Sequence, residues 1–402
     1  MRKLFLAALG ICLYSMAFAQ HLQNALDSFF RSYYAPDAPG AAIAISMNGK
    51  IIFKKAYGLA DLHPETPISN QTNFNVGSLT KQFTAFCILK LVSEKRIFLT
   101  DKLIKYFPSF NKKVGSAITI RQMLCHSSGL FDHYDYMKKA NLVHAGCADV
   151  LNAVEQLDST YFEPGSAYRY SNTAYCLLAL IIEKVSGLPY GEYLKKNIFV
   201  PLDMTHSIIW KSDKSIYKRA FGYDRNGKQQ TFVRSDADES VFFTTEGDGG
   251  LYTSIDDYLK WIFALEGGRI IGQEWIDKAR SPQFLIDSLN RLSYGFGWFI
   301  NQKAKDKAVY HSGSNGGFRA ISFTIPAQKT AIVIFSNRAD IDQEKLLLDL
   351  IRILHINDKY FTKIESFVSF MDCWTNFAPC KEIKLYSTSY IRNLSASVME
   401  LN

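Results

Sequence analysis

The chain reads Val76-Gly77-Ser78-Leu79-Thr80-Lys81, and an apolar segment follows directly as far as Val92. Apolar residues recur in this segment at helical spacing, which predicts a helix. Ser78 and Lys81 then lie three residues apart on one face of its first turn, where hydroxyl and amine are neighbours. A lysine that is partly desolvated at the positive end of a helix loses basicity and can take a serine's proton. The stretch therefore suggests a serine nucleophile. Taken without other motifs, the same S-x-x-K pattern also fits a capped helix whose lysine is solvated.

Two polar clusters further along the chain supply groups that such a nucleophile needs. The first is Tyr168-Arg169-Tyr170-Ser171-Asn172, which lies between a turn and an apolar helical segment. The second is His311-Ser312-Gly313-Ser314-Asn315-Gly316-Gly317, which leads into a predicted strand. Each cluster alone has a purely structural explanation. Asparagine favours turns and helix caps, and a histidine at the end of a strand often forms its hydrogen bonds with neighbouring groups. The order of the three stretches, together with this context, favours a catalytic site.

The motifs S-x-x-K, Y-x-N and H-x-G, in this order, resemble the serine β-lactamase and penicillin-binding-protein superfamily. The Y-x-N form is that of the branch with class C β-lactamases, D,D-carboxypeptidases and related esterases. Three other stretches agree with this branch: IRQMLCHSSGL at 120–130, GGLY at 249–252 and YGFGW at 294–298. Within the first of them we expect Cys125 and His126 to be structural. The likeness extends from about residue 39 to about residue 354.

The resemblance implies catalytic roles for three side chains. Ser78 is expected to be the acylated nucleophile, and Lys81 the partner that takes or relays its proton. Tyr170 is expected to act as general base and acid, passing a proton to the leaving group. Nearby cations favour an ionised phenol, so Lys81 and a charged His311 together suggest that Tyr170 is ionised.

The same resemblance implies a set of substrate contacts, with no cofactor and no metal. Asn172 would hold the substrate amide, and His311, Gly313 and Ser314 would bind the substrate along a strand. The backbone amides of Ser78 and Ser314 would form an oxyanion hole, where losing one donor typically costs about 10²–10³ in rate. No H-E-x-x-H, H-x-H-x-D or G-x-S-x-G motif occurs, so the sequence carries no signature of a zinc hydrolase or an α/β-hydrolase.

His311 stands where class C β-lactamases carry lysine. Lysine stays a compact cation at neutral pH, whereas histidine titrates there, so binding of a substrate carboxylate should be weaker or pH-dependent. The H-x-G form resembles the D,D-carboxypeptidase and D-aminopeptidase branch more than the antibiotic-hydrolysing one. We therefore expect a secreted serine hydrolase that works through an acyl-enzyme on D-amino-acid peptides or on small esters and amides. The alternatives are a β-lactamase proper, or a penicillin-binding sensor or other non-catalytic binding module.

The elements expected around these motifs predict an α/β (α+β) fold, in which an antiparallel β-sheet is flanked by helices. Strands are expected at 41–46, 51–57, 294–300, 319–325 and 331–335. Between them, caps and stops such as Thr119, Ser254 and Gly187 mark helices. We expect a discontinuous sheet subdomain (20–106 and 288–356), an inserted all-helical subdomain (107–287) and a C-terminal tail (357–402) of unknown structure. This arrangement is similar to the β-lactamase/transpeptidase-like fold.

Residues 1–19 have the pattern of a cleaved signal peptide. Arg2 and Lys3 precede an apolar run, and small residues lead up to Ala19, after which cleavage is expected. That run is shorter than the roughly 20 residues of a membrane span, so we expect export to the periplasm or the medium without stable membrane insertion. The net charge of +8 comes without a run of like charges, which argues against a nucleic-acid partner. The expected partner is a small-molecule or peptide substrate, such as a cell-wall peptide or a β-lactam.

The cysteines give no metal-binding pattern. Cys12 belongs to the predicted signal peptide, and no C-x-x-C occurs. Cys87 and Cys176 lie in apolar helical patterns and are expected to be buried thiols. Cys373 and Cys380 are close enough in sequence to pair, although no pattern decides whether they form a disulfide.

Overall fold

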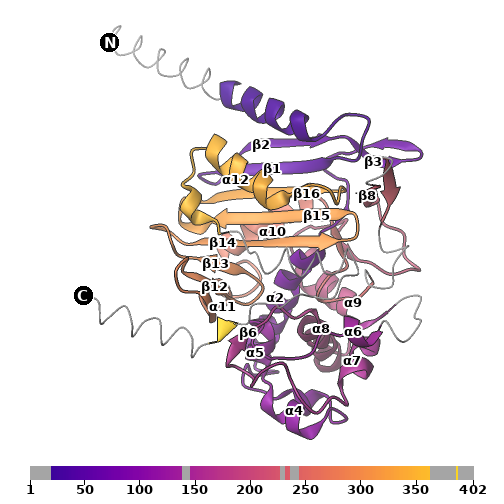
Figure 1. Cartoon of the computed structure of the whole chain (residues 1–402), viewed down its shortest axis with the longest axis vertical. Helices are drawn as coiled ribbons and strands as arrows, with labels where there is room; N and C mark the ends of the chain where they lie inside the picture. Colours follow the sequence, from indigo (N-terminus) through magenta and orange to yellow (C-terminus); the bar gives the residue numbers. More distant parts are fainter. Residues whose placement is uncertain (1–19, 138–144, 227–230, 236–243, 363–385, 388–402) are drawn as a thin grey trace.

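The computed structural model describes residues 20–137, 145–226, 231–235, 244–362 and 386–387. Its centre is an eight-stranded sheet with the order β11-β12-β13-β14-β15-β16-β1-β2, in which every neighbouring pair is antiparallel. Strands from both ends of the chain therefore share one sheet (Figure 1). These strands are β1 (Ala41–Met47), β2 (Lys50–Tyr57), β11 (Phe284–Asp287), β12 (Leu292–Tyr294), β13 (Phe299–Asn301), β14 (Ala308–Asn315), β15 (Phe318–Ile325) and β16 (Thr330–Ser336).

The neighbouring strands β1 and β16 are buried along almost their whole length. They pair from Ala41↔Ser336 to Ser46↔Ala331. Their sequences, AAIAISM and TAIVIFS, are nearly continuous apolar runs because the sheet is covered on both faces. Figure 1 shows α12 (Gln343–Ile353) in front of the sheet and α10 (Ile255–Gly267) behind it. The expected antiparallel sheet flanked by helices is thus confirmed.

Helix α2 (Thr80–Ser93), which continues the S-x-x-K stretch, lies inside the molecule. All of its residues from Thr80 to Leu89 are buried. The ring of Phe83 stacks on Trp261 of α10 with centres 4.4 Å apart, and Phe86 meets the same indole edge-on at 4.9 Å. Aromatic contacts of this kind add to the free energy of burial. They hold the helix that presents the candidate catalytic lysine.

A group of helices packs below the sheet in the view of Figure 1. The longest of them, α8, begins after the capping residue Ser171 and ends at Gly187, whose φ of +76° suits glycine. The helices outside the sheet layer are α3 (Leu103–Tyr106), α4 (Lys112–Ala117), α5 (Ile120–Leu124), α6 (Tyr134–Met137), α7 (Cys147–Val154), α8 (Asn172–Ser186), α9 (Tyr190–Leu194) with a π-helical continuation (Lys195–Phe199), and α11 (Gln273–Ala279).

The stretch 107–287, expected to be all helical, also contains short strands. Runs of two to four residues are too short to show the alternation of apolar and polar residues that identifies a strand in a sequence. One of them, β11, serves as an edge strand of the large sheet. Up to residue 253, the described short strands outside the large sheet are β3 (Leu59–Leu62), β4 (Glu65–Pro67), β5 (Phe74–Asn75), β6 (Ala167–Tyr168), β7 (Ile208–Ile209), β8 (Tyr223–Arg225), β9 (Phe232–Arg234) and β10 (Leu251–Thr253).

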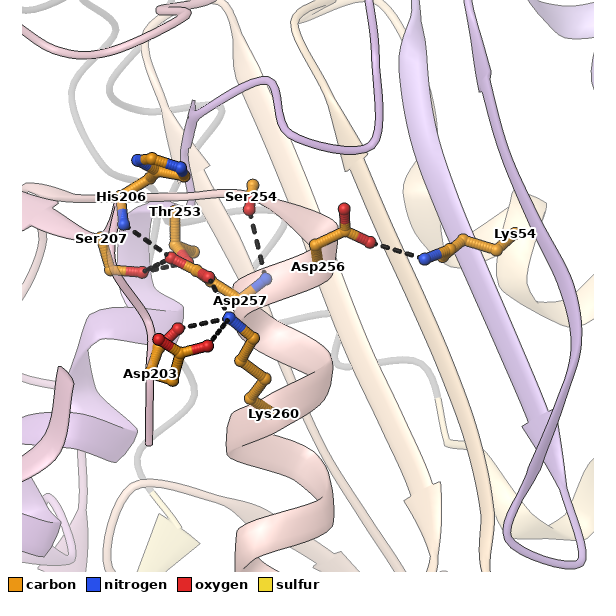
Figure 2. A network of polar contacts seen from close by, with 9 residues as sticks. All are labelled: Lys54, Asp203, His206, Ser207, Thr253, Ser254, Asp256, Asp257 and Lys260. Carbon is orange, nitrogen blue, oxygen red and sulfur yellow. Dashed lines mark hydrogen bonds and ion pairs between the residues drawn. The ribbon is translucent and has the colours of Figure 1, made fainter. Parts of the chain in front are cut away.

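A polar network ties the segment before β7 to the first turn of α10 (Figure 2). The buried Asp257 carboxylate accepts hydrogen bonds from His206 N–H and Ser207 Oγ, both at 3.0 Å. Lys260 donates to the same carboxylate at 3.2 Å, and Asp257 N–H is capped by Ser254 Oγ at 3.2 Å. The network fixes the three-stranded sheet β5-β10-β7, and β5 leads directly to the S-x-x-K stretch.

Two expected strand assignments need correction. The strand expected at 294–300 is divided between β12 and β13 by a turn in which Gly297 has a φ of +90°. A methyl group on Gly297 would lie 2.9 Å from the carbonyl oxygen of Lys81, so this turn packs directly on α2. The H-x-G cluster, expected to precede a strand, is itself part of β14. Its serine, glycine and asparagine residues have low strand propensity, which conceals a strand in the sequence.

Several expectations fall on residues outside the described ranges. These are the signal peptide at 1–19 and the residues Cys373 and Cys380. Of the tail 357–402, the structure describes residues 357–362 and the short strand β17 (Tyr386–Ser387), which pairs with β6. Within the described part of the chain, no helix combines the length and apolar character that crossing a bilayer requires. The division into two subdomains stays a prediction.

Candidate active site

Ser78 lies in a short 3-10 turn, η1 (Gly77–Leu79), that joins β5 to α2. Gly77 adopts a φ of +50°, which glycine tolerates best, and its N–H donates to Asn75 Oδ1 at 2.9 Å. Gly77 and Leu79 are buried, whereas Ser78 is partly exposed. The turn therefore keeps its backbone in the core and presents the Ser78 hydroxyl at the surface.

Lys81 follows in the first turn of α2, and its side chain is fully buried. Its ammonium donates to Ser78 Oγ at 3.0 Å, to Asn172 Oδ1 at 2.7 Å and to the backbone carbonyl of Asp248 at 2.7 Å. Burial lowers the pKa of Lys81 to about 8, against the opposing attraction of the Asp248 carboxylate. The structure thus places an amine with a pKa near neutrality within hydrogen-bond distance of the serine hydroxyl.

Tyr170 lies between β6 and α8, with its side chain near enough to that of Ser78 to affect its pKa. The Lys81 nitrogen lies 4.9 Å from the centre of its ring. Burial raises the pKa of Tyr170 well above its usual value of 10.0, and the nearby Ser78 side chain only partly opposes that rise. The ionised phenol expected from the sequence is therefore wrong for this structure. Tyr170 is a protonated phenol near the candidate nucleophile.

Asn172 is the first residue of α8, so the cap at Ser171 also fixes its position. Its Oδ1 accepts from Lys81, and its Nδ2 donates to the Tyr134 hydroxyl at 3.4 Å. In this structure the Asn172 amide therefore holds the lysine. The contact with a substrate amide that we expect of it stays a prediction.

The glycine-rich end of β14 lies against the serine turn. β13 pairs with the first half of β14 only, and beyond it β14 faces η1. A methyl group on Gly313 would lie 2.0 Å from the Val76 carbonyl oxygen and 3.2 Å from the Ser78 nitrogen. A methyl group on Gly77 would lie 2.8 Å from the Ser314 nitrogen. The backbones of Ser78 and Ser314 are therefore close together, as an oxyanion hole made from their amides would require.

His311 lies on β14 with its ring buried and both ring nitrogens engaged. Nδ1 lies 2.6 Å from the Ser312 carbonyl oxygen and so carries the proton, while Nε2 accepts from the Tyr294 hydroxyl at 3.0 Å. Burial and the nearby Lys81 ammonium lower the pKa of His311 to about 3. The charged His311 expected from the sequence is therefore wrong. The neutral ring lies 6.0 Å from the Tyr170 ring, and its tie to Tyr294 leaves a substrate contact as a prediction only.

Two contributions to the site were not foreseen from the sequence. The Asp248 carbonyl that holds Lys81 belongs to the loop GDGG at 247–250, in which two glycines have positive φ values. Such a glycine-rich turn indicates close backbone approach and is the signal that could have found it. His126, expected to be structural, packs on Tyr170 with ring centres 4.2 Å apart. Nothing in a single sequence marks that contact.

Similar known proteins identify the family of this chain. A family model described as Beta-lactamase matches residues 19–355. Penicillin-binding protein 4* of Bacillus subtilis is 29% identical over 346 residues, which are 82% of this chain and 75% of that protein. Protein flp of Staphylococcus aureus is 29% identical over 335 residues, which are 82% of this chain and 66% of that protein.

Solved structures show the same fold. The octameric penicillin-binding protein homologue from Pyrococcus abyssi aligns with a TM-score of 0.73 and 25% identity, over 87% of this chain and 80% of that one. The D-amino acid amidase from Ochrobactrum anthropi SV3 aligns with a TM-score of 0.64 and 23% identity, over 79% of this chain and 91% of that one. The match of the family model across most of the chain shows that this protein belongs to the Beta-lactamase family, within the superfamily of serine hydrolases and penicillin-binding proteins.

Proposed function

We propose that this chain is an exported serine hydrolase that forms an acyl-enzyme on Ser78 with D-amino-acid peptides or with small esters and amides. The observation that carries the proposal is the Lys81 ammonium, which donates to both Ser78 Oγ and Asn172 Oδ1. Tyr170 lies near the same serine and comes from a third segment. Groups far apart in the sequence thus supply one connected set of proton donors and acceptors around a nucleophile.

Acylation starts from molecules in which Lys81 is a neutral amine. With a pKa of about 8, roughly a tenth of the lysines are neutral at pH 7. The amine takes the hydroxyl proton of Ser78 while Oγ forms a bond to the substrate carbonyl carbon. The resulting ammonium is stabilised by the Asn172 side chain and the Asp248 carbonyl, which are already in place to accept its hydrogen bonds.

Tyr170 serves the second half of acylation. As the bond between the carbonyl carbon and the leaving group breaks, the phenol donates its proton to the leaving nitrogen or oxygen and is reprotonated from the Lys81 ammonium. Its raised pKa suits this acid role, because the phenol keeps a proton to give. The proton of Ser78 thus ends on the leaving group, and lysine and tyrosine return to their starting states.

The backbone of β14 supports the proposed binding of the substrate carbonyl. The amides of Ser78 and Ser314 would stabilise the oxyanion, since charge develops there as the tetrahedral intermediate forms. Beyond the end of β13, β14 continues beside the nucleophile with Gly313 in the strand, and an extended peptide lying along it there would place its carbonyl next to Ser78. An extended backbone next to Ser78 is therefore the expected substrate shape.

The neutral His311 disfavours substrates that carry a free carboxylate, because its ring has no positive charge to bind that group. β-Lactams and the substrates of D,D-carboxypeptidases carry such a carboxylate. One solved neighbour is, by its title, a D-amino acid amidase. We therefore favour amides and esters of D-amino acids over carboxypeptidase action. A β-lactamase proper remains the second candidate, favoured by the family to which the chain belongs.

One set of measurements tests the proposal. The protein is incubated with a D-amino acid amide, a p-nitrophenyl ester, a chromogenic cephalosporin and a fluorescent penicillin, beside Ser78→Ala and Tyr170→Phe. We expect turnover of the amide and ester that Ser78→Ala abolishes and that Tyr170→Phe lowers by about 10²–10⁴ for the amide. Persistent penicillin labelling without turnover of any probe would instead indicate a sensor. Equal turnover by Ser78→Ala would refute the proposed nucleophile.

The proposal includes export, with cleavage after Ala19. The support is the charged, apolar and small-residue pattern of residues 1–19. Expression of the full chain in a bacterial host, followed by fractionation and N-terminal sequencing, should give a mature protein that begins at Gln20. A product that retains Met1 in the cytoplasmic fraction would contradict it.

A further inference from the structure

His126 holds the backbone on both sides of Tyr170. Its carbonyl oxygen accepts from the Arg169 N–H at 3.0 Å, and its ring nitrogen Nδ1 accepts from the Ser171 N–H at 3.0 Å. The residue between these two amides is Tyr170. One histidine thus fixes the chain immediately before and immediately after the candidate acid.

The His126 ring also packs on the Tyr170 ring. The ring centres lie 4.2 Å apart with an interplanar angle of 32°. On its other sides the imidazole meets Tyr294 at 4.5 Å and Tyr175 at 5.1 Å, and it is fully buried. Two backbone bonds and one ring contact, all to the same three-residue segment, leave Tyr170 little freedom to move.

The chemistry of the imidazole fits a fixed acceptor. Because Nδ1 accepts a backbone hydrogen bond, the single proton of the neutral ring is on Nε2. A second proton would occupy Nδ1 and break the bond to Ser171. Burial and the nearby Lys81 ammonium lower the pKa of His126 well below its usual value, so the ring stays an acceptor.

The backbone conformation of His126 comes from its place just past the end of α5. Its φ of +58° is the left-handed conformation that often ends a helix, and asparagine adopts it more readily than most residues. The N–H groups of His126 and Ser127 bond to the Met123 and Gln122 carbonyls in the pattern typical of such an end. The end of α5 therefore fixes the backbone from which His126 reaches the segment 169–171.

We propose that His126 is a positioning residue that sets the Tyr170 hydroxyl on the path between Ser78 and the leaving group. The inference rests on the proposed acid role of Tyr170. A displacement of about 1 Å in a catalytic group can cost on the order of a hundredfold in rate. Losing the Nδ1 acceptor should therefore weaken the step that uses Tyr170 without removing the nucleophile or its base.

The leaving group separates this role from a general loss of structure. An amide nitrogen must be protonated as it leaves, whereas p-nitrophenolate leaves without a proton. We compare a D-amino acid amide with the p-nitrophenyl ester of the same acyl group, so that both pass through one acyl-enzyme. For His126→Phe, which keeps a ring but has no acceptor, kcat/KM for the amide should fall roughly ten- to a hundredfold more than for the ester.

His126→Asn is the matched variant. Asparagine can place Oδ1 near the position of Nδ1 and tolerates the positive φ. We expect it to keep the wild-type ratio of amide to ester turnover. A fall in that ratio for His126→Asn, or an unchanged ratio for His126→Phe, would overturn the proposal. Thermal unfolding shows whether His126→Phe folds. If it does not, the proposal is tested by the amide-to-ester ratio of His126→Asn, and a fall in that ratio overturns it.

Tyr170→Phe shows which proposal has failed. If its amide-to-ester ratio falls as expected but that of His126→Phe does not, the acid role stands and the positioning role is wrong. If Tyr170→Phe itself leaves the ratio unchanged, the acid role of Tyr170 is wrong, and the inference about His126 fails with it.

Discussion

Lys81 is a fully buried lysine, and burial brings its titration near to neutrality. Only the neutral amine can accept the Ser78 proton, so we expect kcat/KM to rise with pH and to level off above a pKa of about 8. The check is a profile from about pH 6 to about pH 10 with a p-nitrophenyl ester, corrected for spontaneous hydrolysis. A profile that is flat through this range would contradict the role of Lys81 as the base.

A control separates this titration from changes in overall charge. Lys345 is an exposed lysine that pairs with Asp349 at 2.7 Å on the surface of α12. Lys345→Met should leave the profile unchanged, whereas Lys81→Met should lower kcat by about 10²–10⁴. Equal effects of the two replacements would mean that charge alone, and not the position of Lys81, sets the rate.

Gly313 is a position where a single methyl group should disrupt the site. In Gly313→Ala the new carbon would lie 2.0 Å from the Val76 carbonyl oxygen, so the serine turn or β14 must move. We expect kcat to fall on the order of a hundredfold, because the Ser78 and Ser314 amides separate. Gly267→Ala, where the nearest atom is 3.6 Å away, is the control for activity assays. Full activity of Gly313→Ala would show that the close approach has no catalytic role.

At the scale of elements, two neighbouring carboxylates at the start of α10, Asp256 and Asp257, should contribute differently to the free energy of unfolding (Figure 2). Asp257 is buried and accepts from His206 N–H, Ser207 Oγ and the Lys260 ammonium. Asp257→Ala leaves these partly buried donors without their acceptor, a loss of about 1–3 kcal/mol in all. We expect its free energy of unfolding in urea to fall by an amount in this range.

Asp256 is the matched comparison in the same helical turn. Its ion pair with Lys54, at 2.6 Å, joins side chains that are 31% and 33% exposed. A half-exposed pair of this kind contributes about 0–1 kcal/mol. Asp256→Ala should therefore destabilise the protein much less than Asp257→Ala. Similar losses for the two variants would show that the buried network does not anchor α10.

The elements that the sequence predicts well are those with chemical signals at their ends. Thr119 forms a capping box with Gln122, Ser254 caps α10, and Gly187 ends α8, each as expected. β14 was not among the expected strands, and its second half is held by pairing with β15 and by packing on η1. Tertiary contacts of this kind override local propensity and leave no periodic pattern.

For the whole molecule, the convergence of the three motifs followed from their resemblance to a family, and the structure brings Ser78, Lys81 and Tyr170 together. The charges of the site were not predictable in the same way. His311 and Tyr170 were expected to be charged and are neutral, because burial decides their protonation. A sequence shows which groups can titrate but not how much water surrounds them in the fold.

Acylation should stabilise the whole molecule. An acyl group on Ser78 whose carbonyl accepts from the Ser78 and Ser314 amides would tie η1 to β14 by hydrogen bonds that only the native state makes. Where the fluorescent penicillin labels Ser78, we expect the labelled protein to melt at a higher temperature than free protein. Ser78→Ala treated in the same way should show no shift. A label that lowers the melting temperature would indicate that the acyl group strains the site.

The pairing of β1 with β16 bears on how the polypeptide is made. The Gly40 N–H bonds to Asn337, 297 positions further along, so the ribosome produces the first hairpin long before its partner strand. At about 5–20 residues per second, that hairpin waits roughly 15–60 s with an apolar edge uncovered. During this interval the apolar edge of β1 lacks its partner strand, and we expect a holding chaperone to bind the nascent chain there.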